Sequence, residues 1–448
     1  MEKFDLIVIG AGSGLDVMAA AAARGMKVAI VEEGPMGGTC LNRGCIPTKI
    51  LIHSADVMQT IKRASLFGIK AGKVSIDFKK IMARARVVDE ESHEIEANIK
   101  NSQNIRLFKG RGRFTGPKKL TVAGKELTAD KIVIAAGTRP SLPPIEGLDK
   151  VPYMTSDEAL HIKKLPKKLV IIGGGYIAVE FAHFFGSLGS KITILQRNVR
   201  LVPDEDEEIG HRFTELFSKQ YEVHVKFAVK KVEKKGERII VYSEQGEVEG
   251  TDLLIATGRV PNSDILDVAK TGVRVDKQGF IETDEYLETN VPGIWAFGDI
   301  AGKFLFKHSA NLEAEYISHN LMGGEHHKAA VDYTAMPHAV FSMPQIAGVG
   351  ATEQELKAKN EDYLVGKYKY IDSGMGTAME EREGFVKFLT DYEGKILGCH
   401  ILGAEASTLI HEVLVSMKRG KGTVADIVQT VHIHPALSEV VQRAAGAV

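Results

Sequence analysis

The sequence lacks the features that mark several common classes of protein. No apolar run in its 448 residues reaches the roughly 18 residues that a membrane-spanning helix needs. Neither sign of charge is in excess, because Lys plus Arg number 57 and Asp plus Glu number 58. The chain therefore has no global field that would attract nucleic acid or an acidic membrane surface. It begins with a predicted strand rather than a secretory signal segment. We therefore expect a cytoplasmic protein that binds neither nucleic acid nor membrane.

Cysteine is also scarce, with three residues in the whole chain: Cys40, Cys45 and Cys399. So few cysteines argue against a structural disulfide framework and favour a catalytic pair. Cys40 and Cys45 lie close together in segment 37–49, so their sulfurs can open and close as a disulfide. The sequence therefore predicts a two-electron dithiol–disulfide centre. Cys399 follows an apolar stretch and is predicted to be a buried core thiol.

The residues after Cys45 predict a helix that continues to about Arg63. Pro47 suits an early turn of this helix, because its fixed φ is compatible with the first turn. A helix N-terminus carries a partial positive charge, which favours a thiolate there. We therefore expect Cys45 to be the sulfur that is stabilised as a thiolate.

The N-terminal region has the pattern of a dinucleotide-binding site. Residues 4–9 form an apolar strand, an alanine-rich helix follows, and a second strand over 28–31 ends at Glu32. The loop after the first strand contains three glycines: Gly10, Gly12 and Gly14. Glycines let the backbone approach a pyrophosphate, helix N–H groups hold its charge, and the acid binds a ribose hydroxyl. The fingerprint departs at its third glycine, since that position is Leu15.

The same pattern returns later in the chain. Residues 169–172 form a second apolar strand, followed by Gly173, Gly175 and Tyr176 and then by a helix and a strand over 191–195. Segments 132–140 and 253–261 are also similar in sequence, and Gly137 and Gly258 occupy matching positions in them. Two copies of one nucleotide-binding architecture predict two bound nucleotides.

The second copy differs from the first after its second strand. Segment 196–200 contains Arg197 and Arg200, where an NAD site usually carries an acid. Arginine binds phosphate as a planar fork, which suits the 2′-phosphate of NADP. We therefore expect NADPH rather than NADH, although NADH stays possible.

Three separated motifs carry a family resemblance. They are the redox segment 38–49, which includes Thr39; segment 293–299, which ends at Asp299; and segment 434–439. Together they resemble the FAD-dependent pyridine nucleotide-disulfide oxidoreductases, such as dihydrolipoamide dehydrogenase, mycothione reductase, glutathione reductase and mercuric reductase. The resemblance implies an α/β fold with two Rossmann-like domains, for FAD and NAD(P), and a C-terminal α+β dimerisation domain. The expected boundaries are 1–145 and 265–334 for FAD, 146–264 for the nicotinamide nucleotide, and 335–448 for dimerisation.

The resemblance also implies roles for individual residues. Cys45 would face the flavin as a thiolate, and Cys40 would be the exchange thiol that attacks the substrate disulfide. Lys49 would approach the flavin and pair with Glu180. Tyr176 would cover the nicotinamide side of the flavin and move away when the nucleotide binds. Thr39 and Asp299 would contact FAD, with Asp299 bonding the ribityl chain.

Thiol exchange needs a general acid–base group that accepts and donates protons. His434 supplies an imidazole, and Glu439 is close enough in sequence to orient it. In the family that the chain resembles, this dyad comes from the other subunit. The resemblance therefore implies a homodimer with a shared active site. His432 matches no catalytic position and is interpreted as structural.

The substrate stays open at this point. The first assignment is dihydrolipoamide dehydrogenase-like, because segment 434–439 resembles that enzyme well. The arginine pair favours the alternative, an NADPH-dependent reductase of a small disulfide similar to mycothione reductase. Glutathione is less favoured, because residues 19–23 are alanines where arginines would bind its carboxylates. A mercuric reductase is a weaker alternative, since the tail 443–448 has no cysteine pair. A flavoprotein that reduces oxygen or quinone is the remaining alternative, and no metal site is predicted.

Overall fold

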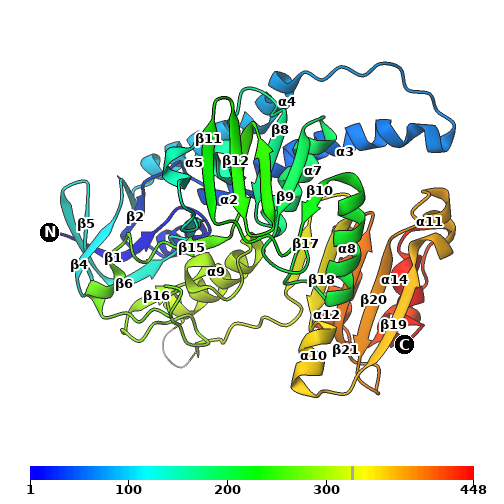
Figure 1. Ribbon diagram of the computed structural model, residues 1–448. Helices are drawn as coiled ribbons and strands as arrows, with labels where there is room; N and C mark the ends of the chain where they lie inside the picture. The colour runs from blue at the N-terminus through cyan, green and yellow to red at the C-terminus, as the bar shows by residue number, and fades with distance from the viewer. Residues whose placement is uncertain (324–326) are drawn as a thin grey trace. The chain divides into compact units, whose positions relative to one another are not determined.

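The computed structural model describes residues 1–323 and 327–448 (Figure 1). The chain forms two compact units. The first contains 1–50, 82–141 and 258–332, and the second contains 51–81, 142–257 and 333–448. The division into FAD, nucleotide and dimerisation domains stays a prediction, because the second unit holds both of the latter. No helix within the described ranges has the length and apolar character needed to cross a membrane.

The first unit contains a sheet with strand order β3-β2-β1-β6-β5-β4, and β16 also pairs with β6. Its strands are β1 (Glu2–Ile9), β2 (Val28–Glu32), β3 (Ile105–Lys109), β4 (Arg113–Gly116), β5 (Lys119–Val122), β6 (Lys125–Ile134) and β16 (Ile294–Ala296). Strands β3, β2, β1, β6 and β16 run parallel, whereas β4 and β5 join antiparallel. Helix α1 (Gly14–Ala23) connects β1 to β2 and packs against α9 (Lys307–Met322). Residues 6–9 of β1 are all buried, as expected for a parallel strand covered on both faces.

The second unit contains a parallel sheet with the order β10-β9-β8-β14. The strands are β8 (Lys168–Ile172), β9 (Lys191–Leu195), β10 (Glu222–His224) and β14 (Asp252–Ile255), and α7 (Tyr176–Ser187) connects β8 to β9. When the first four parallel strands of each repeat are numbered in chain order, both sheets have the strand order 3-2-1-4 of a Rossmann half. The prediction of two Rossmann-like folds is confirmed.

The two repeats agree in register as well as in order. Ile9 pairs with Ile134 at the end of β1, and Ile172 pairs with Ile255 at the end of β8. The next amide donates across the sheet in both copies, from Gly10 to the Val31 carbonyl and from Gly173 to the Leu195 carbonyl, at 2.9 Å each. Val31 and Leu195 are therefore equivalent positions, and the residues that follow them are equivalent too.

The ends of the matching segments 132–140 and 253–261 meet in the first unit. Their ends form β7 (Thr138–Pro140) and β15 (Arg259–Pro261), which pair antiparallel. In the second unit, a separate antiparallel sheet contains β11 (Lys231–Lys235), β12 (Arg238–Ser243) and β13 (Gly246–Gly250).

The C-terminal region forms an antiparallel sheet with the order β17-β18-β21-β20-β19 (Figure 1). Its strands are β17 (Pro337–Val340), β18 (Gln345–Gly350), β19 (Leu364–Lys369), β20 (Phe385–Thr390) and β21 (Ile396–Gly403). Helices α12 (Ala406–Arg419) and α14 (Glu439–Ala445) pack against it. Cys399 lies fully buried in this core, which confirms the prediction, and burial raises the pKa of its thiol.

The remaining α-helices lie in the connections between strands, except for α13, which follows the last strand. They are α2 (Gly38–Arg43), α3 (Cys45–Arg63), α4 (Phe78–Arg84), α5 (Val88–Asn101), α6 (Ser156–Ala159), α8 (Glu207–Gln220), α10 (Glu353–Lys359), α11 (Gly374–Ala378) and α13 (Val424–Val428). Helix α3 begins at Cys45 and ends at Arg63, as the sequence predicts, with Pro47 in its first turn.

Candidate active site

The first glycine loop brings the redox segment against the nucleotide-binding turn. Gly10 has φ +103°, and an added Cβ there would lie 2.3 Å from the Ala135 carbonyl oxygen. The Gly37 amide donates to the Ala11 carbonyl at 2.8 Å. An added Cβ on Gly38 would lie 2.7 Å from the Cα of Gly12. Gly38 must therefore be glycine for this contact to form, which places the segment before Cys40 directly on the predicted FAD loop.

The start of α1 explains the missing third glycine of the fingerprint. Helix α1 begins at Gly14, and its added Cβ would lie 2.9 Å from a methyl group of Val8. Gly14 thus permits close packing of helix on strand, the function normally given to the third glycine. Leu15 packs against the core instead.

Glu32 ends β2 beside this loop. One carboxylate oxygen accepts from the Ala11 amide at 2.7 Å, and the other accepts from the Gly34 amide at 2.6 Å. These bonds fix the carboxylate at the carboxyl edge of the sheet, where a ribose binds in such folds. The position suits the role that the sequence predicts for Glu32.

The second glycine loop has the same backbone conformation and the same close carbonyl contact as the first. Gly173 has φ +118°, and its added Cβ would lie 2.1 Å from the Ala256 carbonyl oxygen. Gly175 is the N-cap of α7, so Tyr176 is the first helical residue. Gln196, the equivalent of Glu32, is buried, and its amide nitrogen lies 2.7 Å from an added Cβ of Gly174. A neutral amide therefore occupies the place of the ribose-binding carboxylate. Sequence reasoning noted the missing acid but did not select Gln196 as a site residue.

The two arginines after Gln196 have different surroundings. Arg197 is exposed at the edge of the nucleotide loop. Arg200 is largely buried, donating to the Pro203 carbonyl at 3.1 Å and contacting Glu207 at 3.4 Å. Arg197 is therefore the arginine that can reach a phosphate without giving up these contacts.

The two redox cysteines lie on consecutive helices of the first unit. Cys40 is within α2, and Cys45 is the first residue of α3. Their side chains are hydrogen-bonded. This bond, followed by burial, raises the pKa of the Cys40 thiol, whereas the Lys307 ammonium lowers it. The raised pKa keeps Cys40 protonated, and the thiolate role of Cys45, at a helix N-terminus, stays a prediction.

Lys307 and Ser13 extend this site in a way the sequence did not reveal. Lys307, the first residue of α9, donates to the Ser13 hydroxyl at 2.7 Å, and Ser13 donates to Asn311 at 2.9 Å. The ammonium thus lies between the glycine loop and Cys40. Only the tertiary packing of α9 on α1 brings these groups together, so no local pattern could have found them.

Asp299 lies at the carboxyl end of β16, in a short 3-10 turn. Its carboxylate accepts from the Thr138 hydroxyl at 3.0 Å, and burial raises the pKa of this carboxyl. The preceding Gly298 amide donates to the buried Glu313 at 2.5 Å, which fixes the turn. A buried carboxylate of this kind gains stability from further hydroxyl donors, such as those of a ribityl chain.

Four other predicted residues occupy compatible places. Gly137 and Gly258 end their strands with φ +62° and +107°. Lys49 is half-buried in the first turns of α3, and Glu180 is buried on α7, accepting from the Phe341 amide at 3.1 Å. The pairing of Lys49 with Glu180 stays a prediction.

The C-terminal dyad is formed within the second unit. His434 Nδ1 lies 3.0 Å from Oε1 of Glu439, and Oε2 of the same carboxylate accepts from the Ala436 amide at 3.1 Å. A carboxylate can only accept, so Nδ1 carries the proton and Nε2 of the neutral ring is a base. The His434 hydrogen bond lowers the pKa of Glu439. The His434 side chain is 75% exposed, so its base is presented outward.

His432 differs from His434 in its surroundings. Its two ring nitrogens contact the Thr430 carbonyl and Glu412, both at 2.9 Å, and its side chain is only 6% exposed. These contacts support the structural interpretation of His432.

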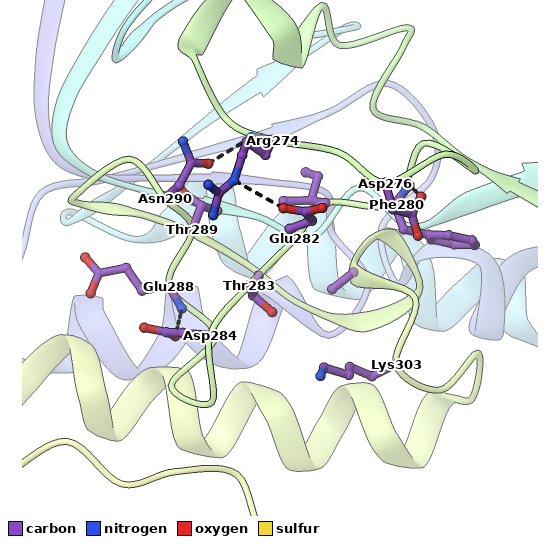
Figure 2. A pocket seen from close by; sticks show the side chains of 12 residues that line it. Arg274, Asp276, Phe280, Glu282, Thr283, Asp284, Glu288, Thr289, Asn290 and Lys303 are labelled. Carbon is purple, nitrogen blue, oxygen red and sulfur yellow. Dashed lines mark hydrogen bonds and ion pairs between the residues drawn. The ribbon is translucent and has the colours of Figure 1, made fainter.

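A cavity of about 630 Å³ lies elsewhere in the first unit. Figure 2 shows that Arg274 and Glu282 form an ion pair in its lining, with Arg274 Nε 3.2 Å from Glu282. The Arg274 amide also donates to Asn290 at 2.8 Å. No predicted site residue lines it. Among the described residues, no group of His, Cys, Asp and Glu side chains could hold a metal ion.

Comparison with known proteins identifies the family. The model of pyridine nucleotide-disulphide oxidoreductases matches residues 4–323, and the model of their dimerisation domain matches residues 336–445. The chain belongs to this family. Mycothione reductase from Mycobacterium tuberculosis is 38% identical over 458 residues, covering 99% of each chain. Dihydrolipoyl dehydrogenase from Bacillus subtilis is 34% identical over 455 residues, covering 98% of this chain and 95% of the relative.

A solved structure agrees with this assignment. The Cu(II) complex of the HOCl-induced flavoprotein disulfide reductase RclA from Escherichia coli matches with a TM-score of 0.89 and 28% identity. The match covers 100% of this chain and 99% of that one. This oxidoreductase therefore acts on sulfur groups with a flavin and a nicotinamide nucleotide, and it carries the family's dimerisation domain.

Proposed function

We propose that this oxidoreductase uses NADPH to reduce a small disulfide, through FAD and the Cys40–Cys45 pair. The observation that carries the choice of nucleotide is Gln196, a neutral residue where the first repeat has Glu32. A carboxylate there would repel a 2′-phosphate, whereas an amide does not. The exposed Arg197 that follows supplies a cation for the same phosphate.

Binding residues follow from the two repeats. FAD is held by the first loop and its neighbours: Gly10, Gly12, Gly14, Glu32, Thr39, Gly137 and Asp299. NADPH is held by the second, through Gly173, Gly175, Arg197 and Gly258, and Tyr176 moves aside for it. Bound there, FAD would supply the two-electron redox chemistry that links NADPH to the Cys40–Cys45 disulfide. The chain's own residues carry out the thiol chemistry.

The thiol steps balance as two exchanges. The Cys40 thiolate attacks the substrate disulfide, forming a mixed disulfide and expelling one substrate thiolate. The Cys45 thiolate then attacks the Cys40 sulfur, which restores the Cys40–Cys45 disulfide and expels the second substrate thiolate. The raised pKa of Cys40 means that a base must remove its proton first. His434 takes this proton at Nε2 and returns it to the leaving thiolate, with Glu439 fixing the ring.

We propose that His434 serves the active site of a partner subunit. Its imidazole points outward, and two neighbouring apolar side chains are also exposed, Val431 by 95% and Ile433 by 80%. Such a patch beside an exposed catalytic base suits burial against a second copy of the chain. The cytoplasmic location stays a prediction.

A second candidate is the first assignment from the sequence, oxidation of dihydrolipoamide with NAD. Dihydrolipoyl dehydrogenases are among the relatives, at 33% to 34% identity. The neutral Gln196 argues against it, because NAD sites use the missing acid.

A steady-state panel distinguishes the candidates. It measures NADPH and NADH oxidation with low-molecular-weight disulfides, including mycothiol and glutathione disulfides, and reduction of NAD and NADP by dihydrolipoamide. We expect the highest kcat/KM for NADPH with one of the disulfides, and loss of that turnover in Cys40→Ser. Higher kcat/KM for dihydrolipoamide with NAD would establish the second candidate. NADPH oxidation that needs neither a disulfide nor Cys40 would instead indicate an oxidase.

A further inference from the structure

A hydrogen-bonded chain holds the side chain of Tyr176 beside the second glycine loop. The Tyr176 hydroxyl donates to one oxygen of Glu205. The other Glu205 oxygen accepts from Nε2 of His338 at 2.9 Å. Glu205 is fully buried, and Tyr176 and His338 stack with ring centroids 6.4 Å apart and planes at 21°. Both oxygens of a carboxylate removed from water are thus engaged, one of them by Tyr176.

The His338 end of the chain packs on a neighbouring strand of the C-terminal sheet. An added Cβ on Gly348 of β18 would lie 2.6 Å from the His338 ring and 3.0 Å from His400 Nδ1. Gly348 therefore leaves the space that the His338 ring occupies. His400 is also fully buried and contacts the Ala351 carbonyl at 2.9 Å. The ring that anchors Glu205 therefore packs directly against the backbone of β18.

The charges of the pair reinforce each other. Burial alone would raise the pKa of Glu205, but His338, Tyr176 and His400 together outweigh it, and the pKa is lowered. Burial alone would lower the pKa of His338, but Glu205 outweighs it, and the pKa is raised. Asp204 and Glu355 add to the negative field at His338. A charged acceptor makes the bond from Tyr176 stronger than one between neutral groups.

We propose that Glu205 and His338 are positioning residues that latch Tyr176, and that the nicotinamide half of NADPH breaks the Tyr176–Glu205 hydrogen bond when it binds. This inference rests on the proposed function, in which Tyr176 occupies the path of the nicotinamide and moves aside. The latch opposes nucleotide binding, because part of the binding free energy is spent on releasing Tyr176. Removing the hydroxyl therefore tightens nucleotide binding, whereas loss of a purely structural contact would weaken it.

The test is a double-mutant cycle on nucleotide affinity. The dissociation constant of NADP⁺ is measured by calorimetry on the oxidised, FAD-loaded enzyme, so no turnover is needed. We expect Tyr176→Phe to bind NADP⁺ about tenfold more tightly, as the release of one hydrogen bond to a charged group implies. Glu205→Gln should tighten binding in the same direction, and the double variant should bind no more tightly than Tyr176→Phe alone.

The matched control is Tyr242→Phe. Tyr242 also donates its hydroxyl to a glutamate, Glu233, but within the separate sheet of β11 to β13. This variant should bind NADP⁺ as the wild type does. Unchanged or weaker binding in Tyr176→Phe would overturn the latch, as would additive effects in the double variant. If Glu205→Gln does not fold, the NADP⁺ dissociation constants of Tyr176→Phe and Tyr242→Phe still test the proposal. Failure of the disulfide reductase assignment would appear separately, as turnover that survives Cys40→Ser.

Discussion

Replacing Gln196 by glutamate should convert the second nucleotide site toward NADH. The internal repeat identifies the position to change. Gln196 and Glu32 are equivalent, because they follow the equivalent residues Leu195 and Val31. The new carboxylate would lie beside Gly174 as the Glu32 carboxylate lies beside Ala11. It would accept from the ribose hydroxyls of NADH and repel the 2′-phosphate of NADPH.

The size of the effect can be estimated from these two terms. A net hydrogen bond to a charged group contributes about 1.5 kcal/mol. Two unit charges about 5 Å apart repel by about 3.3 kcal/mol at an effective dielectric constant of about 20. Arg197 is exposed, so the site is partly screened by water and salt. Halving the total for this screening leaves about 2.4 kcal/mol, or about a 50-fold change in the ratio of the two kcat/KM values.

The assay measures kcat/KM for NADPH and NADH with one disulfide acceptor. Gln245→Glu is the matched control, since it adds the same charge to an exposed loop between β12 and β13. The control should leave the NADPH to NADH ratio within about twofold of the wild type, as screened surface charges do. An unchanged ratio in Gln196→Glu would refute the equivalence of Gln196 and Glu32 on which the NADPH assignment rests.

Two further predictions concern the proton and the backbone. In His434→Gln, the rate of disulfide reduction at pH 7 should fall by about 10²-fold or more. The rate should recover as the pH rises, because the raised pKa of Cys40 leaves little thiolate when the base is missing. A pH–rate profile checks this, and an unchanged profile would contradict the role of His434. Gly173→Ala should lower the unfolding temperature more than Gly189→Ala, because both have φ near +110° but only Gly173 has a carbonyl within 2.1 Å of an added Cβ. The Gly189 change carries only the left-handed strain of about 1–2 kcal/mol, and equal shifts in calorimetry would show that the predicted clash is relieved.

Much of the fold could be predicted because its signals are local. Both glycine loops follow apolar strands, and the acid after 28–31 and the absence of one after 191–195 are visible in the sequence. The helix from Cys45 to Arg63 follows from its apolar spacing and Pro47. Even the link between His434 and Glu439 is short in sequence, and the structure shows the hydrogen bond.

Other parts depend on contacts between distant segments. Lys307 reaches Ser13 only because α9 packs on α1. Glu205 and His338 are separated by 133 residues, and neither carries a local pattern that indicates a role. Arg200 matched a phosphate-binding expectation, yet its guanidinium contacts Pro203 and Glu207 within its own unit. Such burial cannot be read from residue type and spacing.

The central claim is that electrons from NADPH reach the substrate through the Cys40–Cys45 disulfide. Anaerobic titration of the FAD-loaded enzyme with dithionite tests it most directly, with Cys45→Ser titrated alongside and Cys399→Ser as the control. The account predicts that the wild type and the Cys399 variant take up one electron pair per subunit more than the Cys45 variant. Equal electron uptake by all three proteins would contradict it.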